Sequence, residues 1–293
     1  MTFLSKFTVK AQKGKAEEFR ELHHRKRILI LPNGWDVPSA RVFEDAGFPA
    51  IATSSAGMLV SLGYPDGEVI GRDEFVSAVG RIAGVLSVPL SADIVAGFGK
   101  TTKDVLITVK AILKTGAVGI NIEDFAHATK KLYPIEKQVR NVKAIRKIGE
   151  TVGVPIVINA RTDALRYAEG DEEARFKEAI RRATAYRDAG ADCVYPMGLT
   201  DPASIASFVL ALDFPVNVMV RKGLPEISVL QRLGVARVSF GPSPSYAAMG
   251  LLKRAAKEVL GKGTYENLVE GAITFDELNA LTVPRTRGSE NQH

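Results

Sequence analysis

The chain has 293 residues, of which 46% are hydrophobic and 25% are charged. This composition is typical of a folded globular protein with a large buried core. It therefore excludes a disordered chain and a mini-protein that needs disulfides or a structural metal for stability. The single Cys193 cannot form an internal disulfide, and no Cys/His cluster has zinc-site spacing. Lys and Arg exceed Asp and Glu by enough to give a net charge of +6, which favours anionic partners without selecting their class.

Two features of the sequence bear on location and partners. No apolar run approaches the roughly 20 residues of a membrane span, and residues 1–15 lack the apolar centre of a secretory signal. We therefore expect a cytoplasmic protein that does not bind membranes. The basic cluster at residues 23–27 has no aromatic platform beside it, which argues against a nucleic-acid interface and favours a solvated helix end.

The predicted elements begin with an arm or helix over residues 1–27, and then repeat one pattern. A short run of apolar, β-branched residues is followed by a turn and by a stretch with helical periodicity, as in Glu172–Ala189. The runs, in chain order, are Ile28–Pro32, Pro49–Thr53, Val88–Asp93, Ala117–Glu123, Val154–Arg161, Asp192–Pro196, Phe214–Val220 and Val235–Gly241. Several of the helices between them end in Gly, which permits the left-handed backbone that stops a helix.

These eight units predict the fold. Strands that read as continuous apolar runs are buried on both faces, which indicates a parallel sheet. Eight strand-then-helix units in this length are typical of an α/β (β/α)8 TIM barrel, here over residues 28–262. A doubly wound open sheet is the alternative, but its phosphate-binding fingerprint is missing. Residues 263–293 are expected to form an additional helix at Glu266–Thr282 and a mobile tail at Arg285–His293.

A barrel carries its active site at the carboxyl ends of its strands, so the polar residues that follow each run are the candidates. In chain order they include Trp35, Ser54, Ser55, Asp93, Glu123, Arg161 and Asn217. Asp93 and Glu123 end neighbouring strands, and two such carboxylates together favour a hard cation such as Mg²⁺, with Mn²⁺ as an alternative. Both acids could instead be helix caps or ion-pair partners.

Anion recognition is the second predicted property of this edge. The planar fork of Arg161 matches a carboxylate or phosphonate, although pairing with Asp163 as a structural link is an alternative. The Ser54–Gly57 turn offers hydroxyl and main-chain N–H donors for an anionic oxygen, or is only a tight strand-to-helix turn. A metal beside an anion pocket suits a 2-oxo acid whose enolate forms when a bond to C3 breaks.

The motifs identify a family. They are LPNGWDVPSARVFEDAGFPAIATSSAG at 31–57, LGYPDGE at 62–68, SADIVAGFG at 91–99, GINIED at 119–124, NARTDAL at 159–165 and PVNVMV at 215–220. Taken in this order, they resemble the isocitrate lyase/phosphoenolpyruvate mutase superfamily over roughly residues 29–260, including its methylisocitrate lyase-like and carboxyvinyl-carboxyphosphonate phosphorylmutase-like branches.

The resemblance implies a (β/α)8 barrel that uses Mg²⁺ on small 2-oxo or 2-hydroxy carboxylates and cleaves or forms C–C or P–C bonds. It also implies a homo-oligomer, commonly a tetramer that exchanges its last barrel helix. Carried over by motif, Asp66 is the catalytic acid, while Ser54, Ser55 and Ala56 bind the substrate carboxylate and enolate oxygen. Asp93 and Glu123 hold the metal, mostly through water. Arg161 is a second catalytic residue that contacts the substrate, and Asn217 also contacts the substrate.

Two departures from the family pattern narrow the reaction. Val95 stands where many relatives carry a second acid, which removes one oxygen ligand. The segment 124–134 lacks the cysteine that serves as acid/base in isocitrate and methylisocitrate lyases, which argues against those two reactions. A C–C lyase on another 2-oxo acid is the leading hypothesis, and a P–C bond mutase or hydrolase and an inactive barrel with a binding or assembly role are the alternatives.

Overall fold

The computed structural model describes residues 8–282, and each predicted apolar run contains a strand. The barrel strands are β1 (Leu29–Leu31), β2 (Asn33–Gly34), β3 (Ile51–Thr53), β4 (Leu90–Asp93), β5 (Gly119–Glu123), β8 (Val157–Thr162), β9 (Cys193–Pro196), β10 (Asn217–Met219) and β11 (Arg237–Ser239). A small antiparallel hairpin, β6 (Phe125–Ala126) with β7 (Lys131–Leu132), follows β5.

The parallel strands close into a barrel. One sheet has the order β2-β3-β4-β5-β8-β9 and the other has the order β1-β11-β10. β1 and β2 are two halves of one barrel strand, separated by Pro32, which has no N–H for the ladder. On the other side, a parallel bridge between Val194 and Val216 joins β9 to the segment before β10. The predicted (β/α)8 barrel is therefore confirmed, and the open sheet is not formed.

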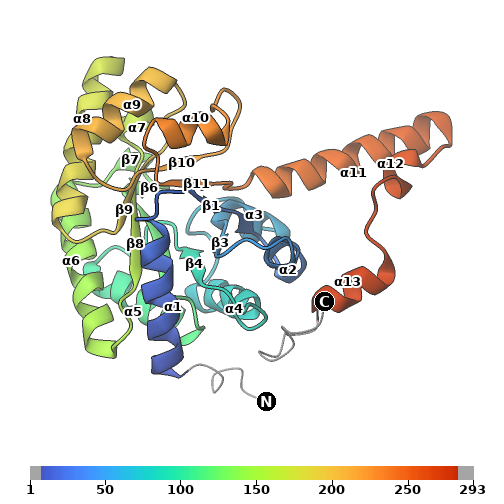
Figure 1. The fold of residues 1–293 in the computed structure, drawn as a ribbon, viewed down its shortest axis with the longest axis horizontal. Helices are drawn as coiled ribbons and strands as arrows, with labels where there is room; N and C mark the ends of the chain where they lie inside the picture. The colour runs from blue at the N-terminus through green and yellow to red at the C-terminus, as the bar shows by residue number, and fades with distance from the viewer. Residues whose placement is uncertain (1–7, 283–293) are drawn as a thin grey trace.

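Helices surround the strands in Figure 1. The helices among residues 8–282, including those that project from the barrel, are α1 (Val9–Leu22), α2 (Val37–Asp45), α3 (Ser55–Ser61), α4 (Arg72–Ala83), α5 (Thr102–Lys114), α6 (Ile135–Val152), α7 (Ala164–Tyr167), α8 (Glu172–Asp188), α9 (Pro202–Leu212), α10 (Ile227–Arg232), α11 (Ser243–Lys262), α12 (Glu266–Val269) and α13 (Phe275–Thr282). Local sequence sets their ends: Asp36 and Ser39 form a capping box at the start of α2, and Gly190 follows α8 with φ +103°. Within residues 8–282, no helix combines the length and apolar character that crossing a membrane requires.

Helix α1 covers the amino-terminal end of the barrel. Arg20 donates to the main-chain carbonyl of Pro155 (3.1 Å) and pairs with Asp192 (2.7 Å), both of which precede barrel strands. The ring of Phe19 is fully buried and lies against Gly119, at the start of β5. This helix closes the end of the barrel opposite the carboxyl ends of the strands.

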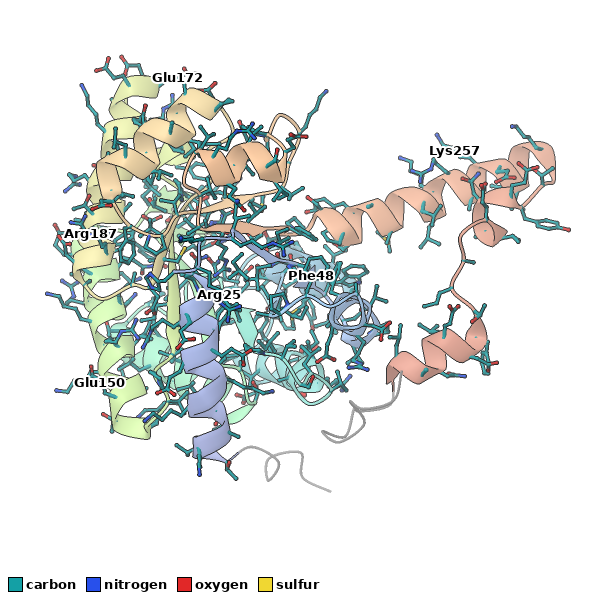
Figure 2. All side chains as sticks on the ribbon, viewed as in Figure 1. Arg25, Phe48, Glu150, Glu172, Arg187 and Lys257 are labelled. Carbon is teal, nitrogen blue, oxygen red and sulfur yellow. The ribbon has the colours of Figure 1, made fainter. Side chains whose placement is uncertain are left out.

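The carboxyl-terminal helices leave the barrel. Helix α11 projects outward, and in Figure 2 the side chains around Lys257 have no barrel residues beside them. The prediction of a single helix at Glu266–Thr282 is wrong. The structure has two helices, α12 and α13, because the helical backbone is interrupted between them, where Gly271 has φ +70°. Helix α13 returns to α2, where Leu281 accepts a hydrogen bond from Arg41 (2.8 Å). The predicted tail at 285–293 lies outside the described residues. The exchange of the last barrel helix between subunits stays a prediction. Leu260 on α11 is 89% exposed, as expected of a helix face that a neighbouring subunit would cover.

Candidate active site

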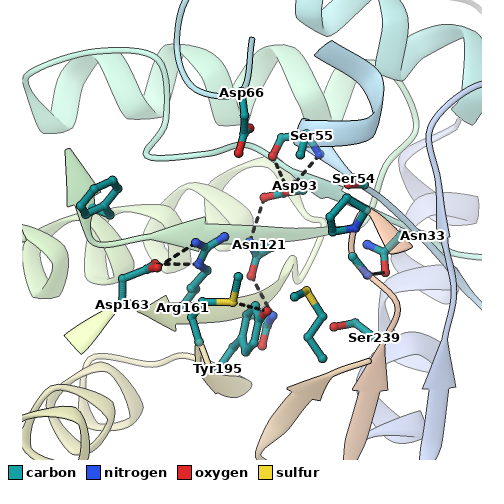
Figure 3. A pocket seen from close by; sticks show the side chains of 18 of the residues that line it. Asn33, Ser54, Ser55, Asp66, Asp93, Asn121, Arg161, Asp163, Tyr195 and Ser239 are labelled. Carbon is teal, nitrogen blue, oxygen red and sulfur yellow. Dashed lines mark hydrogen bonds and ion pairs between the residues drawn. The ribbon is translucent and has the colours of Figure 1, made fainter. Parts of the chain in front are cut away.

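A cavity of about 890 Å³ lies inside the barrel and includes the carboxyl ends of its strands. Most of the predicted site residues line it, namely Ser54, Ser55, Ala56, Asp66, Asp93, Arg161 and Asn217. Figure 3 shows Asp66, Asp93 and Arg161 approaching one region of this space from three different segments. The strand ends therefore bring together residues that lie almost 100 positions apart in the sequence.

Asp93, at the end of β4, is fixed by its neighbours. Its Oδ2 accepts hydrogen bonds from the main-chain N–H (3.0 Å) and the hydroxyl (2.6 Å) of Ser55, and its Oδ1 accepts one from the amide of Asn121 (2.8 Å). Figure 3 draws these contacts as a continuous network across β4 and β5. The carboxylate is therefore held in one orientation, and Oδ1 keeps a lone pair for another ligand.

Arg161, on β8, is held between two acids. Its Nε and Nη2 donate to Asp163 (2.7 and 2.9 Å), and its Nη1 lies 2.8 Å from Oε2 of Glu123. The predicted alternative of an Arg161–Asp163 link is thus present, and the two roles coexist. A guanidinium has five N–H donors, so two are left for a ligand in the cavity that Arg161 lines.

Glu123 does not line the cavity. It is 2% exposed, and its Oε1 is 2.5 Å from Nε2 of His127 while Oε2 faces Arg161. Burial raises the pKa of Glu123 against the opposing effect of Arg161. The hydrogen bond to Glu123 raises the pKa of His127, so the two groups are poised to share a proton.

Asp66 comes from the loop between α3 and α4 and lines the cavity. Partial withdrawal from water and the nearby Asp93 carboxylate raise its pKa, while His127 and Arg161 oppose that rise. The direction of this shift favours a protonated carboxyl group at higher pH than is usual for an aspartate. That property suits a group that donates a proton to a substrate.

The small-residue turn before α3 is a real strand-to-helix turn. The hydroxyl of Ser54 caps the helix by accepting from the Gly57 N–H (3.2 Å), and Ser55 is bound to Asp93. Among the described residues, no group accepts from the N–H of Ala56, which lines the cavity. Trp35 is placed elsewhere: it packs beside Gly57, outside the cavity lining, and its predicted contact with substrate has no support in this geometry.

Comparison with known proteins identifies the family. Residues 19–260 match the family described as phosphoenolpyruvate phosphomutase. The chain is 31% identical over 278 residues to 2-methylisocitrate lyase of Escherichia coli, covering 90% of each protein. It is 30% identical over 274 residues to oxaloacetate decarboxylase of Chromohalobacter salexigens, covering 90% of this chain and 88% of that protein.

The chain belongs to the phosphoenolpyruvate mutase/isocitrate lyase superfamily. A solved structure from Burkholderia cenocepacia, described as a lyase or mutase, shares 35% identity with a TM-score of 0.85, and the match covers 92% of this chain and 96% of that one. The predicted resemblance is thus confirmed, and the protein is an enzyme of this superfamily by descent.

The donor set of this superfamily member fits a largely hydrated Mg²⁺. Mg²⁺ takes oxygen ligands and is usually held by one or two carboxylates, with waters in the remaining places. Asp93 lines the cavity and keeps a lone pair on Oδ1, whereas Glu123 lies outside the cavity lining with its oxygens paired to His127 and Arg161. Within residues 8–282, no three His, Cys, Asp or Glu side chains form a metal centre by themselves. Glu123 would therefore reach such an ion through water, and its role as a ligand stays a prediction.

Val95 removes a further ligand from the superfamily pattern. Its side chain is 1% exposed and its φ is +54°, a left-handed conformation that β-branched residues rarely adopt. The carbonyl of Val95 accepts from the Glu123 N–H (2.9 Å), which fixes the loop after β4. The loop therefore makes a left-handed turn at this position, and its side chain there is apolar and not acidic.

Sequence reasoning missed the polar residues deeper in the barrel. Ser91, Asn121, Asn159 and Arg237 all line the cavity. Ser91, Asn159 and Arg237 each stand two positions before a residue that lines the mouth of the cavity, at the carboxyl end of the same strand, and side chains at that spacing face the same way. The alternation inside INIE and INAR was therefore a signal, and reading each run as uniformly apolar concealed it.

Proposed function

We propose that this protein is a Mg²⁺-dependent lyase that cleaves a C–C bond of a small 2-oxo or 2-hydroxy carboxylate through a pyruvate-type enolate. The convergence of Asp66, Asp93 and Arg161 on one cavity carries the proposal, because it combines a proton donor, a carboxylate for a metal and a cation for an acid. The names of the relatives from E. coli and C. salexigens support it, since both refer to reactions of small carboxylic acids.

The chain's own residues bind and orient the acid in this proposal. Arg161 is held rigid by Asp163 and Glu123, so its two remaining N–H donors meet a carboxylate without reorganisation. The N–H of Ala56 supplies a further donor for an anionic oxygen. Mg²⁺ held through Asp93 would polarise the substrate carbonyl and favour the enolate.

Asp66 handles the proton. Cleavage of a 2-oxo acid leaves the electron pair on C3 of the pyruvate fragment. Cleavage of a 2-hydroxy acid, in which the hydroxyl group loses its proton and becomes the pyruvate carbonyl, leaves the pair on the other fragment. A proton delivered to that carbon completes the product in either case. The raised pKa of Asp66 favours the protonated carboxyl group more than in an ordinary aspartate, and its position facing the cavity allows the transfer. Such a group contributes about 10²–10⁴-fold to a reaction rate.

The reaction is tested by a substrate screen. Release of pyruvate is measured with a coupled assay from oxaloacetate, methylisocitrate, dimethylmalate and phosphonopyruvate, each with and without Mg²⁺. Metal-dependent release from oxaloacetate or dimethylmalate is the expected result, and methylisocitrate, whose cleavage relies on the missing cysteine, should release none. Turnover of phosphonopyruvate alone would replace the C–C lyase with the P–C alternative.

Substitution of Asp66 tests the assigned proton donor. Asp66→Ala should lower turnover by about 10²–10⁴-fold while the melting temperature stays unchanged, because the side chain is exposed to the cavity. Asp73→Ala, an exposed aspartate in the first turn of α4, is the matched control and should keep full activity. Full activity of Asp66→Ala would refute the assignment.

An inactive barrel with a binding role is the second candidate, favoured by Val95 and by the occupied oxygens of Glu123. Isothermal titration of Mg²⁺ together with oxalate, an enolate mimic, separates it from the lyase. A lyase binds oxalate more tightly when Mg²⁺ is present. Binding of oxalate without any dependence on Mg²⁺ would favour the inactive barrel.

A further inference from the structure

The floor of the cavity holds polar atoms without partners. We call the inward residues Ser91, Asn159 and Arg237 the floor residues; each precedes a mouth residue by two positions and lies about 7 Å deeper. Among the described residues, four buried side-chain nitrogen or oxygen atoms lack a hydrogen-bond partner, and three of them are Ser91 Oγ, Asn159 Oδ1 and Arg237 Nη1. Buried polar atoms are normally paired, so this grouping points to a missing ligand.

Arg237 is the most unusual of the three. It is 2% exposed, and within residues 8–282 its guanidinium forms no ion pair, in contrast to the equally buried Arg41, which pairs with Glu44. Burial lowers the pKa of Arg237 to about 10, so it stays charged at neutral pH. An unpaired cation in a protein interior is strongly unfavourable, and this chain pairs its other buried arginines.

The groups around Arg237 do not supply the missing negative charge. On β9, burial raises the pKa of Cys193 to about 12 and raises that of Tyr195 as well, so both are neutral. From α1, His23 lies close enough for Arg237 to contribute to a lowered pKa of about 3, so it is neutral too.

The remaining neighbour is Asp93, a carboxylate whose charge opposes the lowering of the Arg237 pKa. Among the described residues, its oxygens accept hydrogen bonds from Ser55 and Asn121 and none from Arg237. It forms no ion pair with Arg237 within residues 8–282, so the guanidinium has room for an anion of its own.

We propose that Arg237, together with Asn159 and Ser91, forms an anion subsite that binds the distal carboxylate of a dicarboxylic substrate. The inference rests on the proposed function in one respect: the 2-oxo acid end of the same molecule lies at the mouth, near Arg161. A cavity that reaches from Arg161 to Arg237 admits an acid with a second anionic arm. The planar fork of Arg237 is suited to that carboxylate, while the hydroxyl of Ser91 adds a donor.

Binding of a matched pair of acids tests the subsite directly. Glutarate and pentanoate have the same chain length, but only glutarate has a second carboxylate. By isothermal titration at pH 7.5, the protein should bind glutarate at least about tenfold more tightly than pentanoate. Arg237→Met should abolish this preference and Arg237→Lys should keep part of it. Arg232→Met, the same exchange at an exposed position, should leave it unchanged.

The overturning results are equal binding of both acids by the wild-type protein, or an undiminished glutarate preference in Arg237→Met. Melting temperatures of the variants show whether a lost glutarate preference comes from a destabilised fold. Because methionine removes an unpaired buried charge at similar volume, Arg237→Met should melt no lower than the wild-type protein. A large fall in its melting temperature would instead assign Arg237 a structural role and overturn the proposal.

The failure of this inference is distinguishable from failure of the proposed function. An Arg237-dependent glutarate preference without turnover of any 2-oxo acid would leave the subsite in place and remove the lyase. Turnover of a 2-oxo acid with no glutarate preference would keep the lyase and remove the subsite.

Discussion

Two arginines inside the barrel, Arg161 at the mouth and Arg237 on the floor, differ in what surrounds their guanidinium groups. Arg161 makes a two-bond fork with Asp163 and a third contact with Glu123. Arg237 is more deeply buried, yet an Nη1 hydrogen-bond partner is missing among the described residues. Pairing at the mouth fixes geometry for chemistry, whereas the unpaired charge below costs stability that a ligand can restore.

A second set of paired charges, centred on Asp124, lies next to the residues that hold Arg161 at the mouth. Asp124 is fully buried, and its Oδ2 accepts from Thr162 (2.8 Å), Tyr186 (2.7 Å) and Arg182 (3.0 Å). Its Oδ1 accepts from the main-chain N–H of Asp163 (2.9 Å), the residue that holds Arg161. The mouth is therefore rigid because each charge is oriented by another, a property that the floor lacks.

Removal of Asp124 is expected to have the largest effect on this contrast. Asp124→Ala leaves Arg182 without its buried partner and leaves three other donors unsatisfied, which should lower the free energy of unfolding by about 3–5 kcal/mol. Urea denaturation followed by circular dichroism measures the loss. Asp188→Ala, an exposed aspartate in α8, is the control and should change stability by less than about 1 kcal/mol. Equal effects of the two substitutions would contradict the supporting role of Asp124.

Exchange of Arg161 for lysine is expected to have a smaller effect. Lysine keeps the charge but cannot make the fork to Asp163 and the contact to Glu123 together, so Arg161→Lys should cost about 1–3 kcal/mol of stability. Arg181 makes a fork of the same geometry with Glu178, but on the surface. Arg181→Lys is therefore the matched control and should cost less than about 1 kcal/mol. Similar losses for both exchanges would show that burial adds nothing to the mouth pairing.

The barrel was predictable because its evidence is repeated along the chain. All eight apolar runs contain strands, and Glu172–Asp188 forms the helix that its periodicity predicts. Because the unit repeats, an error in one unit does not change the predicted fold. The first strand is an example: it was predicted as one strand, but Pro32 divides it into β1 and β2. The break between α12 and α13 was missed because nothing repeats there, so the prediction rested on periodicity alone.

The site was predictable at the ends of strands and not below them. Asp93 and Arg161 end their runs, and the fold rule places such residues at the mouth. Which residues pair with one another depends on three-dimensional distances that spacing does not encode. The occupied oxygens of Glu123 and the placement of Trp35 outside the cavity are two results of that kind. Arg237 was overlooked because it lies within a run that was read as uniformly apolar.

His23, which lies near Arg237 of the floor, makes the stability of the folded protein depend on pH. Its Nδ1 lies 2.8 Å from the carbonyl of Phe19 and therefore carries the proton, and burial together with Arg237 lowers its pKa to about 3. The unfolded chain has a histidine pKa near 6.5, so between those two values it binds more protons than the folded protein. Stability from this residue is thus complete above about pH 6.5 and falls as the pH drops toward 3, by up to about 1.4 kcal/mol per pH unit.

His23→Asn should remove this part of the pH dependence while keeping a donor for the Phe19 carbonyl. Urea denaturation at pH 5.0 and 6.5 measures it, since most carboxylates stay ionised in that range. The stability of the wild-type protein should fall more steeply than that of His23→Asn, and His24→Asn, an exposed neighbour, serves as the control. Because Arg237 contributes to the lowered pKa, Arg237→Met should raise the pKa of His23 in the folded protein above about 3, which NMR titration of the imidazole ring measures. If Arg237→Met leaves the folded-state pKa of His23 unchanged, the charge on Arg237 does not reach His23, and the floor is less polar than its unpaired atoms indicate.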